Sequence, residues 1–185
     1  LKVSDSYEFY QGVQSPYDGN TWIYLERELI GAGYNLNLYN TSTGKKTTLI
    51  SDKNPQRENL AFKPIGWAKD AGKIYLEGLY LDTSTEHEGI WVYDLDKKSS
   101  SKLAISFKYM RTPILTPGRD KFLILKSNDQ NYDQMHGTPD VLVEYDVTKN
   151  SEQLIIDAKG DDIQIIGWTN QSNQIKKTAP PMSTS

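Results

Sequence analysis

The stretch Val13-Gln-Ser-Pro-Tyr-Asp-Gly-Asn-Thr-Trp-Ile-Tyr-Leu-Glu26 decides the fold, because its pattern returns three more times along the chain. An apolar entry leads into a polar turn with Gly, Asp or Asn, and an apolar-rich run follows the turn. The other copies are Ile65-Gly-Trp-Ala-Lys-Asp-Ala-Gly-Lys-Ile-Tyr-Leu-Glu77, Ile114-Leu-Thr-Pro-Gly-Arg-Asp-Lys-Phe-Leu-Ile-Leu-Lys126 and Ile166-Gly-Trp-Thr-Asn-Gln-Ser-Asn-Gln-Ile175, the last of which is cut short. A polar turn between two apolar runs predicts a β-hairpin.

A second pattern follows each of the first three hairpins. Its copies are 34–50, 89–105 and 141–156. In each copy a strand reaches a Tyr-Asp or Tyr-Asn pair, a polar turn containing Lys follows, and a short apolar strand closes the unit. The positions that we match between copies recur about every 50 residues, a spacing typical of a four-stranded propeller blade. They are Ile23, Ile74, Phe122 and Ile175 in the first pattern and Tyr39, Tyr93 and Tyr145 in the second.

The sequence therefore predicts an all-β chain of about three four-stranded β-propeller blades plus the start of a fourth. We expect at least about twelve strands and no helix longer than about two turns. The predicted blades are 8–50, 61–105, 109–157 and a partial 163–175, followed by a flexible tail or linker at 176–185. The competing interpretation is a β-sandwich whose hairpins happen to look alike.

Blade number leaves three arrangements open. Propellers typically have about 4–8 blades and close into a ring, which hides their sheet edges. Three and a partial blade would be a piece of a longer propeller, would close by association, or would form an open stack with capped ends.

Composition excludes several classes of function. The 185 residues include 21 Lys and Arg against 24 Asp and Glu, for a net charge of −3. The chain lacks the excess of basic residues that would favour nucleic acid as a partner. Cysteine is absent, which excludes disulfides, zinc–thiolate sites and a cysteine nucleophile. No apolar run reaches the roughly 18 residues that a membrane span needs.

The repeats resemble the TolB-like propeller repeat, which also forms the propellers of prolyl-oligopeptidase-type peptidases. That repeat reads Ser-Pro-Asp-Gly-Lys before an apolar strand, and later a strand ending in Tyr-Asp and then Thr-Gly. Ser15-Pro16-Tyr17-Asp18-Gly19 is the closest version of its first part, and Thr43-Gly44 matches its Thr-Gly turn. The resemblance covers roughly 8–175. It implies a propeller, and it leaves the particular function open because fold does not fix function.

The loops between the second and third strand of each blade, here called b–c loops, are the predicted recognition surface. Long polar loops on a rigid scaffold commonly bind ligands. The two histidines lie in the b–c loops 83–89 and 127–140, so we expect them on the same rim of adjacent blades. The candidate ligand-binding residues are Glu26, Arg27, Glu86, His87, Asp133 and His136.

We predict no catalytic residue, no bound metal and no cofactor. Propeller lyases that resemble this fold hold a divalent cation with a histidine cluster, and such a cluster needs more than the two histidines present here. No Gly-x-Ser-x-Gly elbow occurs either. Trp67 and Trp168 share an Ile-Gly-Trp context, so we expect both to be buried at equivalent places.

Three hypotheses of function remain. The first is a non-catalytic binding or protein-interaction module outside the cytoplasm, in the periplasm, at the cell envelope or secreted. Its partner would be a protein, peptide or glycan, and self-association or further blades would complete the propeller. The second, implied by the resemblance, is an accessory propeller of a peptidase or other hydrolase whose catalytic domain lies outside this chain. The third is a metal-dependent propeller lyase.

Overall fold

The structure, a computed structural model, describes residues 7–28, 33–52, 60–80, 87–105, 111–127 and 138–166. These residues form twelve strands and no helix, which confirms the all-β prediction. The strands are β1 (Tyr7–Gln14), β2 (Thr21–Glu28), β3 (Tyr34–Asn40), β4 (Lys46–Asp52), β5 (Leu60–Trp67), β6 (Lys73–Tyr80), β7 (His87–Asp94), β8 (Ser99–Lys102), β9 (Ile114–Leu115), β10 (Lys121–Lys126), β11 (Val141–Asp146) and β12 (Ser151–Asp157). Within this part of the chain no helix could cross a membrane.

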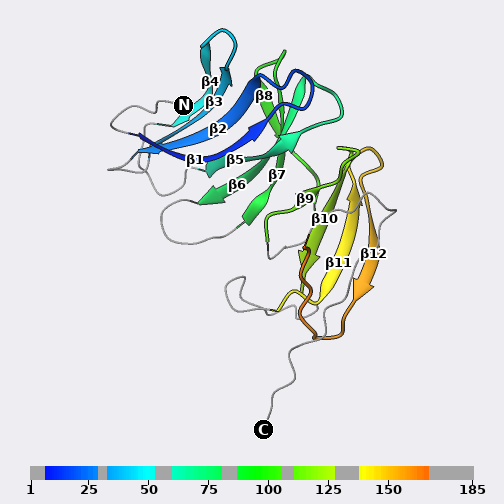
Figure 1. Cartoon of the computed structure of the whole chain (residues 1–185). Helices are drawn as coiled ribbons and strands as arrows, with labels where there is room; N and C mark the ends of the chain where they lie inside the picture. Colours follow the sequence, from blue (N-terminus) through cyan, green and yellow to red (C-terminus); the bar gives the residue numbers. More distant parts are fainter. Residues whose placement is uncertain are drawn as a thin grey trace.

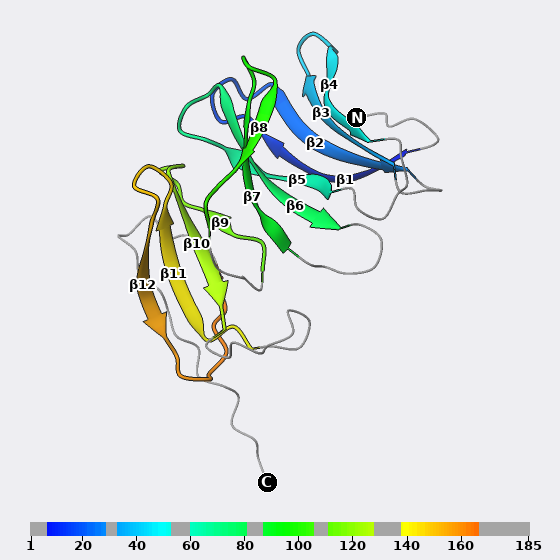
Figure 2. The ribbon, with the colours of Figure 1, turned by 180° about the vertical axis from the view of Figure 1, so that it is seen from behind.

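The strands form three separate four-stranded antiparallel sheets (Figure 1). Each sheet pairs its strands in chain order, so β1–β4 form blade 1, β5–β8 form blade 2 and β9–β12 form blade 3. The first strands of the blades, β1, β5 and β9, lie innermost, and β5 contacts both of the others. Seen from behind, the sheets fan out around these strands without closing a ring (Figure 2). This arrangement confirms the prediction of partial propeller blades.

Two apolar clusters hold neighbouring blades together, because alternate side chains of a strand point to opposite faces. We call the face of a blade toward the next blade its following face and the other its preceding face. The following face of blade 1 packs on the preceding face of blade 2. The buried members of this first cluster are Ile23, Leu36, Trp67, Ile74, Leu76 and Tyr93. The following face of blade 2 packs in the same way on blade 3, and the buried members are Ala68, Tyr75, Ile90, Phe122, Ile124, Val141, Val143 and Tyr145.

Trp67 is buried in the first cluster with 5% of its surface exposed, which confirms the prediction for that residue. Trp168 and Ile175 lie outside the described residues.

Strand pairing corrects one equivalence drawn from the sequence. Trp22 lies opposite Tyr39, as Ile74 lies opposite Tyr93 and Phe122 opposite Tyr145. Trp22, rather than Ile23, is therefore the counterpart of Ile74. The match of Ile23 with Ile74 was wrong by one residue, and a slip of one residue moves a side chain to the other face of the sheet.

Candidate functional site

The turn between β1 and β2 is fixed by a single carboxylate. Asp18 accepts hydrogen bonds from the backbone N–H groups of Asn20 and Thr21, at 3.1 and 3.0 Å, and from the Thr21 hydroxyl at 2.6 Å. These bonds, led by the one from the Thr21 side chain, lower the pKa of Asp18 to about 2. The turn holds Tyr17 at its tip, with 44% of its surface exposed.

Tyr17 links the turns of the three blades. Its hydroxyl donates to the backbone carbonyls of Ala68 and Lys69 in the corresponding turn of blade 2, the second at 2.9 Å. The backbone N–H of Lys69 donates in turn to the carbonyl of Arg119 in blade 3, at 3.1 Å. An ion pair of 3.3 Å between Lys69 and Asp120 reinforces that second link. The first turns of all three blades therefore form one connected rim.

A groove of about 370 Å³ opens beside this rim, where β1, β5 and β9 converge. Its walls come from all three blades and are mainly apolar. They are Val13, Gln14, Pro16, Ile65, Gly66, Trp67, Leu115, Thr116, Pro117 and Arg119. We call it the axial groove.

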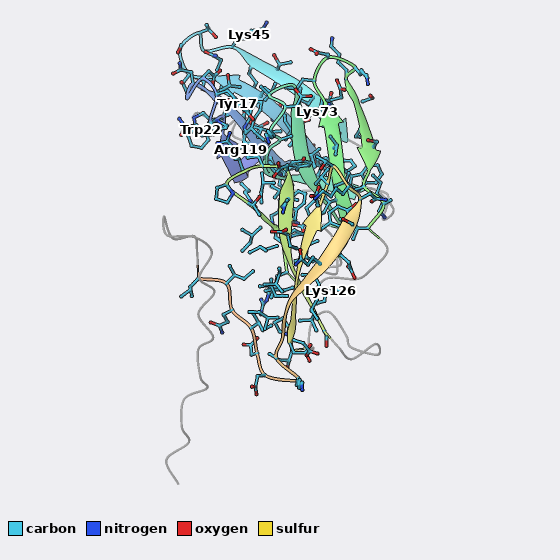
Figure 3. The ribbon with its side chains drawn as sticks, turned by 90° about the vertical axis from the view of Figure 1, so that its right-hand side faces the viewer. Tyr17, Trp22, Lys45, Lys73, Arg119 and Lys126 are labelled. Carbon is cyan, nitrogen blue, oxygen red and sulfur yellow. The ribbon has the colours of Figure 1, made fainter. Side chains whose placement is uncertain are left out.

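Arg119 is the one charged residue among the described residues that line the axial groove. Its guanidinium carbon lies 5.2 Å from the centre of the Tyr17 ring, and the two side chains lie together in Figure 3. This geometry is that of a cation–π contact. No described carboxylate forms an ion pair with Arg119. The groove therefore offers a stacked guanidinium to an anionic group with an apolar body.

Three of the residues predicted from the sequence are described, and they lie toward the other end of their strands. Glu26 and Arg27 lie near the end of β2, and His87 is the first residue of β7. Glu26 is 2% exposed and accepts hydrogen bonds from Lys46 at 2.8 Å and Asn37 at 2.9 Å. Arg27 is half-buried, opposite Tyr34. Glu86, Asp133 and His136 lie outside the described residues.

Sequence reasoning missed the axial groove and its two central side chains. The one sequence signal for the groove was Tyr17, an aromatic residue inserted into a turn whose sequence in the TolB-like repeat is Ser-Pro-Asp-Gly. The Pro-Gly-Arg-Asp turn gives no sign that Arg119 stacks on Tyr17, because this contact joins blades 1 and 3.

The part of the chain that the structure describes brings together no three His, Cys, Asp or Glu side chains in a metal-binding arrangement.

Comparison with known proteins places the fold. No family model and no curated protein matches the sequence. Among solved structures, TolB from Acinetobacter baumannii matches 78% of this chain and 31% of its own, with a TM-score of 0.52 and 12% identity. An uncharacterized protein from Listeria monocytogenes EGD-e matches 82% of this chain and 41% of its own, also with a TM-score of 0.52 and 12% identity.

The fold is that of TolB-like propeller blades. Acylaminoacyl peptidase from Pyrococcus horikoshii matches 81% of this chain and 25% of its own, with a TM-score of 0.50 and 14% identity. The chain thus spans between a quarter and about two fifths of the length of these proteins. At sequence identities this low, the similarity between this chain and these proteins shows a shared fold and nothing more.

Proposed function

We propose that this chain is a non-catalytic binding module built on TolB-like propeller blades, and that its axial groove holds a segment of a partner protein. The observation that carries the proposal is the guanidinium of Arg119, which pairs with no described carboxylate and stacks on Tyr17 beside an apolar groove. Arginine forms paired hydrogen bonds with carboxylates. The partner segment would therefore combine apolar side chains with a carboxylate.

The linked turns support this role. A ligand that meets a preorganised surface loses less conformational freedom of the protein on binding. The bonds from Tyr17 to blade 2 and from Lys69 to blade 3 hold the groove walls before any partner arrives. The likeness to TolB supports a location outside the cytoplasm, in the periplasm, at the envelope or in the exterior.

The test is selection of peptides from a displayed random library on the purified chain. We expect enriched peptides to carry Asp, Glu or a free carboxyl terminus beside apolar residues. Arg119→Glu should weaken their binding about tenfold or more, because it sets two negative charges against each other. Arg27→Glu changes the same charge at the far end of the blade and should leave binding unchanged.

The same selection tests the b–c rim. Peptides that bind Arg119→Glu normally but lose affinity for Arg27→Glu or a His87→Ala, His136→Ala double variant would move the site to that rim, where the sequence also predicts Glu86 and Asp133. A library that yields no binder to the folded chain would contradict the binding function itself.

A second candidate is an accessory propeller of a larger hydrolase, which the likeness to acylaminoacyl peptidase favours. A hydrolase domain encoded beside these blades, with peptidase activity that changes when the blades carry Arg119→Glu, would support it over the first.

A further inference from the structure

The first turns of blades 1 and 3 are built alike, and each contains one residue with a left-handed backbone. In blade 1 the backbone N–H of Gly19 donates to the carbonyl of Ser15, the first residue of the turn, at 3.2 Å. In blade 3 the N–H of Arg119 donates in the same way to Thr116, at 2.9 Å. Gly19 has a φ of 64° and Arg119 a φ of 58°. Arg119 therefore occupies the place that blade 1 gives to a glycine.

The backbone of that turn gives no reason for an arginine. A left-handed conformation crowds the Cβ of every residue except glycine, so the geometry favours glycine. Lys98 adopts a similar conformation in the exposed turn between β7 and β8, with a φ of 51°. Arg119 differs from Lys98 because its side chain crosses to blade 1, stacks on Tyr17 and lines the axial groove. Residues held in an unfavourable backbone conformation cluster at functional sites, which supports a functional role for this side chain.

Arg119 is also the cation that the linked turns leave unpaired. The turns 15–21, 68–73 and 116–121 contain four cations. Arg119 forms no ion pair with a described carboxylate. The other three form ion pairs of 2.6–3.3 Å, namely Lys69 with Asp120, Lys73 with Asp70, and Lys121 with Glu144. The groove thus offers one positive charge that these turns do not use.

The groove wall provides few further hydrogen-bond donors for an anion. Pro16 and Pro117 line it, and proline has no backbone N–H. The side-chain amide of Gln14 already donates to the backbone carbonyl of Gly19. An anion in the groove would therefore depend mainly on the guanidinium of Arg119.

A carboxylate suits a single guanidinium better than a phosphate does. Two parallel N–H groups of an arginine meet the two oxygens of a carboxylate, and the charges balance. A phosphate group on a side chain brings three acceptor oxygens and a charge of about −1.5 to −2. Asp18 and Asp120 belong to the same turns as Tyr17 and Arg119, so their negative charges would oppose the second charge of the phosphate.

We propose that the axial groove selects a single carboxylate and rejects a phosphorylated segment, with Arg119 as the residue that determines this specificity. The inference rests on the proposed function, because it names the anion that the partner segment carries. A second negative charge placed against this mainly apolar wall would have no counter-charge, which is costly. The side chains of Asp and Glu and a free carboxyl terminus share the selected chemistry.

The test uses three capped peptides that differ in one side chain: acetyl-Leu-Leu-Asp-amide, acetyl-Leu-Leu-Asn-amide and acetyl-Leu-Leu-phosphoserine-amide. At about pH 7.5 these side chains are singly charged, neutral and almost doubly charged. NMR titration follows the backbone amide signals of Gly66 and Leu115, which line the groove. The Asp peptide should bind about tenfold more tightly than the Asn peptide, and at least about threefold more tightly than the phosphoserine peptide.

A fourth peptide separates the two sources of a carboxylate. Acetyl-Leu-Leu with a free carboxyl group places the charge at the chain end. Tighter binding than the Asp peptide would assign the selected carboxylate to a carboxyl terminus, and weaker binding would assign it to a side chain. Both orders agree with selection of a single carboxylate.

Arg119→Gly separates the binding role from the fold. It should reduce the affinity of the Asp peptide to that of the Asn peptide. The melting temperature should stay within about 3 °C of wild type, because relief of the left-handed Cβ offsets the lost stacking on Tyr17. Lys98→Gly makes the same kind of change at a residue that does not line the groove, and should leave the binding of all peptides unchanged. Arg119→Lys keeps the charge and should restore part of the preference for Asp over Asn.

Three results would overturn the proposal. Binding of the phosphoserine peptide as tight as that of the Asp peptide would contradict the selection and leave the proposed binding function intact. A fall in melting temperature of more than about 5 °C in Arg119→Gly would show that the fold requires this side chain. If no peptide shifts the signals of Gly66 and Leu115, both this inference and the role of the groove in the proposed function are wrong.

Discussion

Two strands of this chain carry the same four residues and use them in opposite ways. Ile23-Tyr24-Leu25-Glu26 lies in β2 and Ile74-Tyr75-Leu76-Glu77 in β6. Ile23 belongs to the following face of blade 1 and Ile74 to the preceding face of blade 2, so both enter one cluster from opposite sides. Tyr24 donates a hydrogen bond to Glu26 on the preceding face of blade 1. Tyr75 instead packs edge-on against Phe122 of blade 3, with ring centres 4.9 Å apart.

The turn before each strand decides this difference. Seven residues, 15–21, separate the paired Gln14 and Trp22 in blade 1. Six residues, 68–73 and 116–121, separate the equivalent pairs of blades 2 and 3. The extra residue shifts the tetrapeptide by one place relative to its neighbours, which exchanges its two faces. Identical letters in two strands therefore do not establish that the side chains have identical surroundings.

The two glutamates give the largest test of this comparison. Glu77 is fully buried, 3.2 Å from Lys63, and accepts a hydrogen bond from Thr112 at 2.8 Å. Glu77→Ala leaves the mostly buried Lys63 without its counter-charge and should lower the free energy of unfolding by about 3–5 kcal/mol. Glu26→Ala should cost less, about 1–3 kcal/mol, because Lys46 reaches solvent.

Urea unfolding of both variants measures the two losses. Glu77→Gln, which keeps an acceptor for Thr112, should fall between wild type and Glu77→Ala. A greater loss for Glu26→Ala than for Glu77→Ala would reverse our assignment of the two environments.

The two isoleucines test the register. Ile23→Ala and Ile74→Ala should each lower the free energy of unfolding by about 2–5 kcal/mol, as for other large-to-small changes in a core. Because both residues line one cluster, the loss in the double variant should differ from the sum by about 0.5–3 kcal/mol. Ile23→Ala combined with Ile124→Ala, in the other cluster, should be additive. Additivity of the first pair would argue against a shared cluster.

The two tyrosines predict an effect at high pH. Burial, with a further contribution from the charge of Asp120, raises the pKa of Tyr75 to about 12. The folded protein then binds the phenolic proton more tightly than the unfolded chain, whose tyrosines titrate near 10. This contribution to stability is complete below about pH 10 and is lost as pH rises toward 12.

Unfolding experiments between pH 9 and about 12 should show that loss, and Tyr75→Phe should make the slope shallower. Tyr39→Phe removes a less buried phenol and serves as the control. An unchanged slope in Tyr75→Phe would show that Tyr75 does not cause the loss.

The smallest expected effect concerns the turn that sets the register. The pKa of Asp18 lies at about 2 in the folded protein, below its ordinary value, because of the bonds from Thr21. A depressed pKa contributes stability above the unfolded value of about 4 and loses it as pH falls toward 2. Asp18→Asn should therefore flatten the acid side of the stability profile. Asp96→Asn, an exposed change of the same chemistry, should leave that profile as in wild type.

The repeat pattern was sufficient to predict the blades and most of the strands. Turn residues and period-2 runs act locally, so Asp18-Gly19 and the run 121–126 specify a turn and a strand without knowledge of the rest. The face that each side chain takes was not predictable from the same letters, because one inserted residue, Tyr17, changes the pairing. The axial groove depends on contacts between residues far apart in sequence, such as Tyr17 and Arg119. Such contacts arise only when the blades pack together, so the sequence pattern did not predict them.

The strand order also has a consequence for how the chain is made. All pairings among the described strands join consecutive strands of one blade, so each sheet is complete within a short stretch of chain. Local pairings form quickly, and domains fold from the amino terminus during synthesis. Blade 1 can thus assemble on the ribosome before blade 2 has emerged. Until blade 2 emerges, the face with Ile23 and Leu36 that it will cover is open to wrong partners.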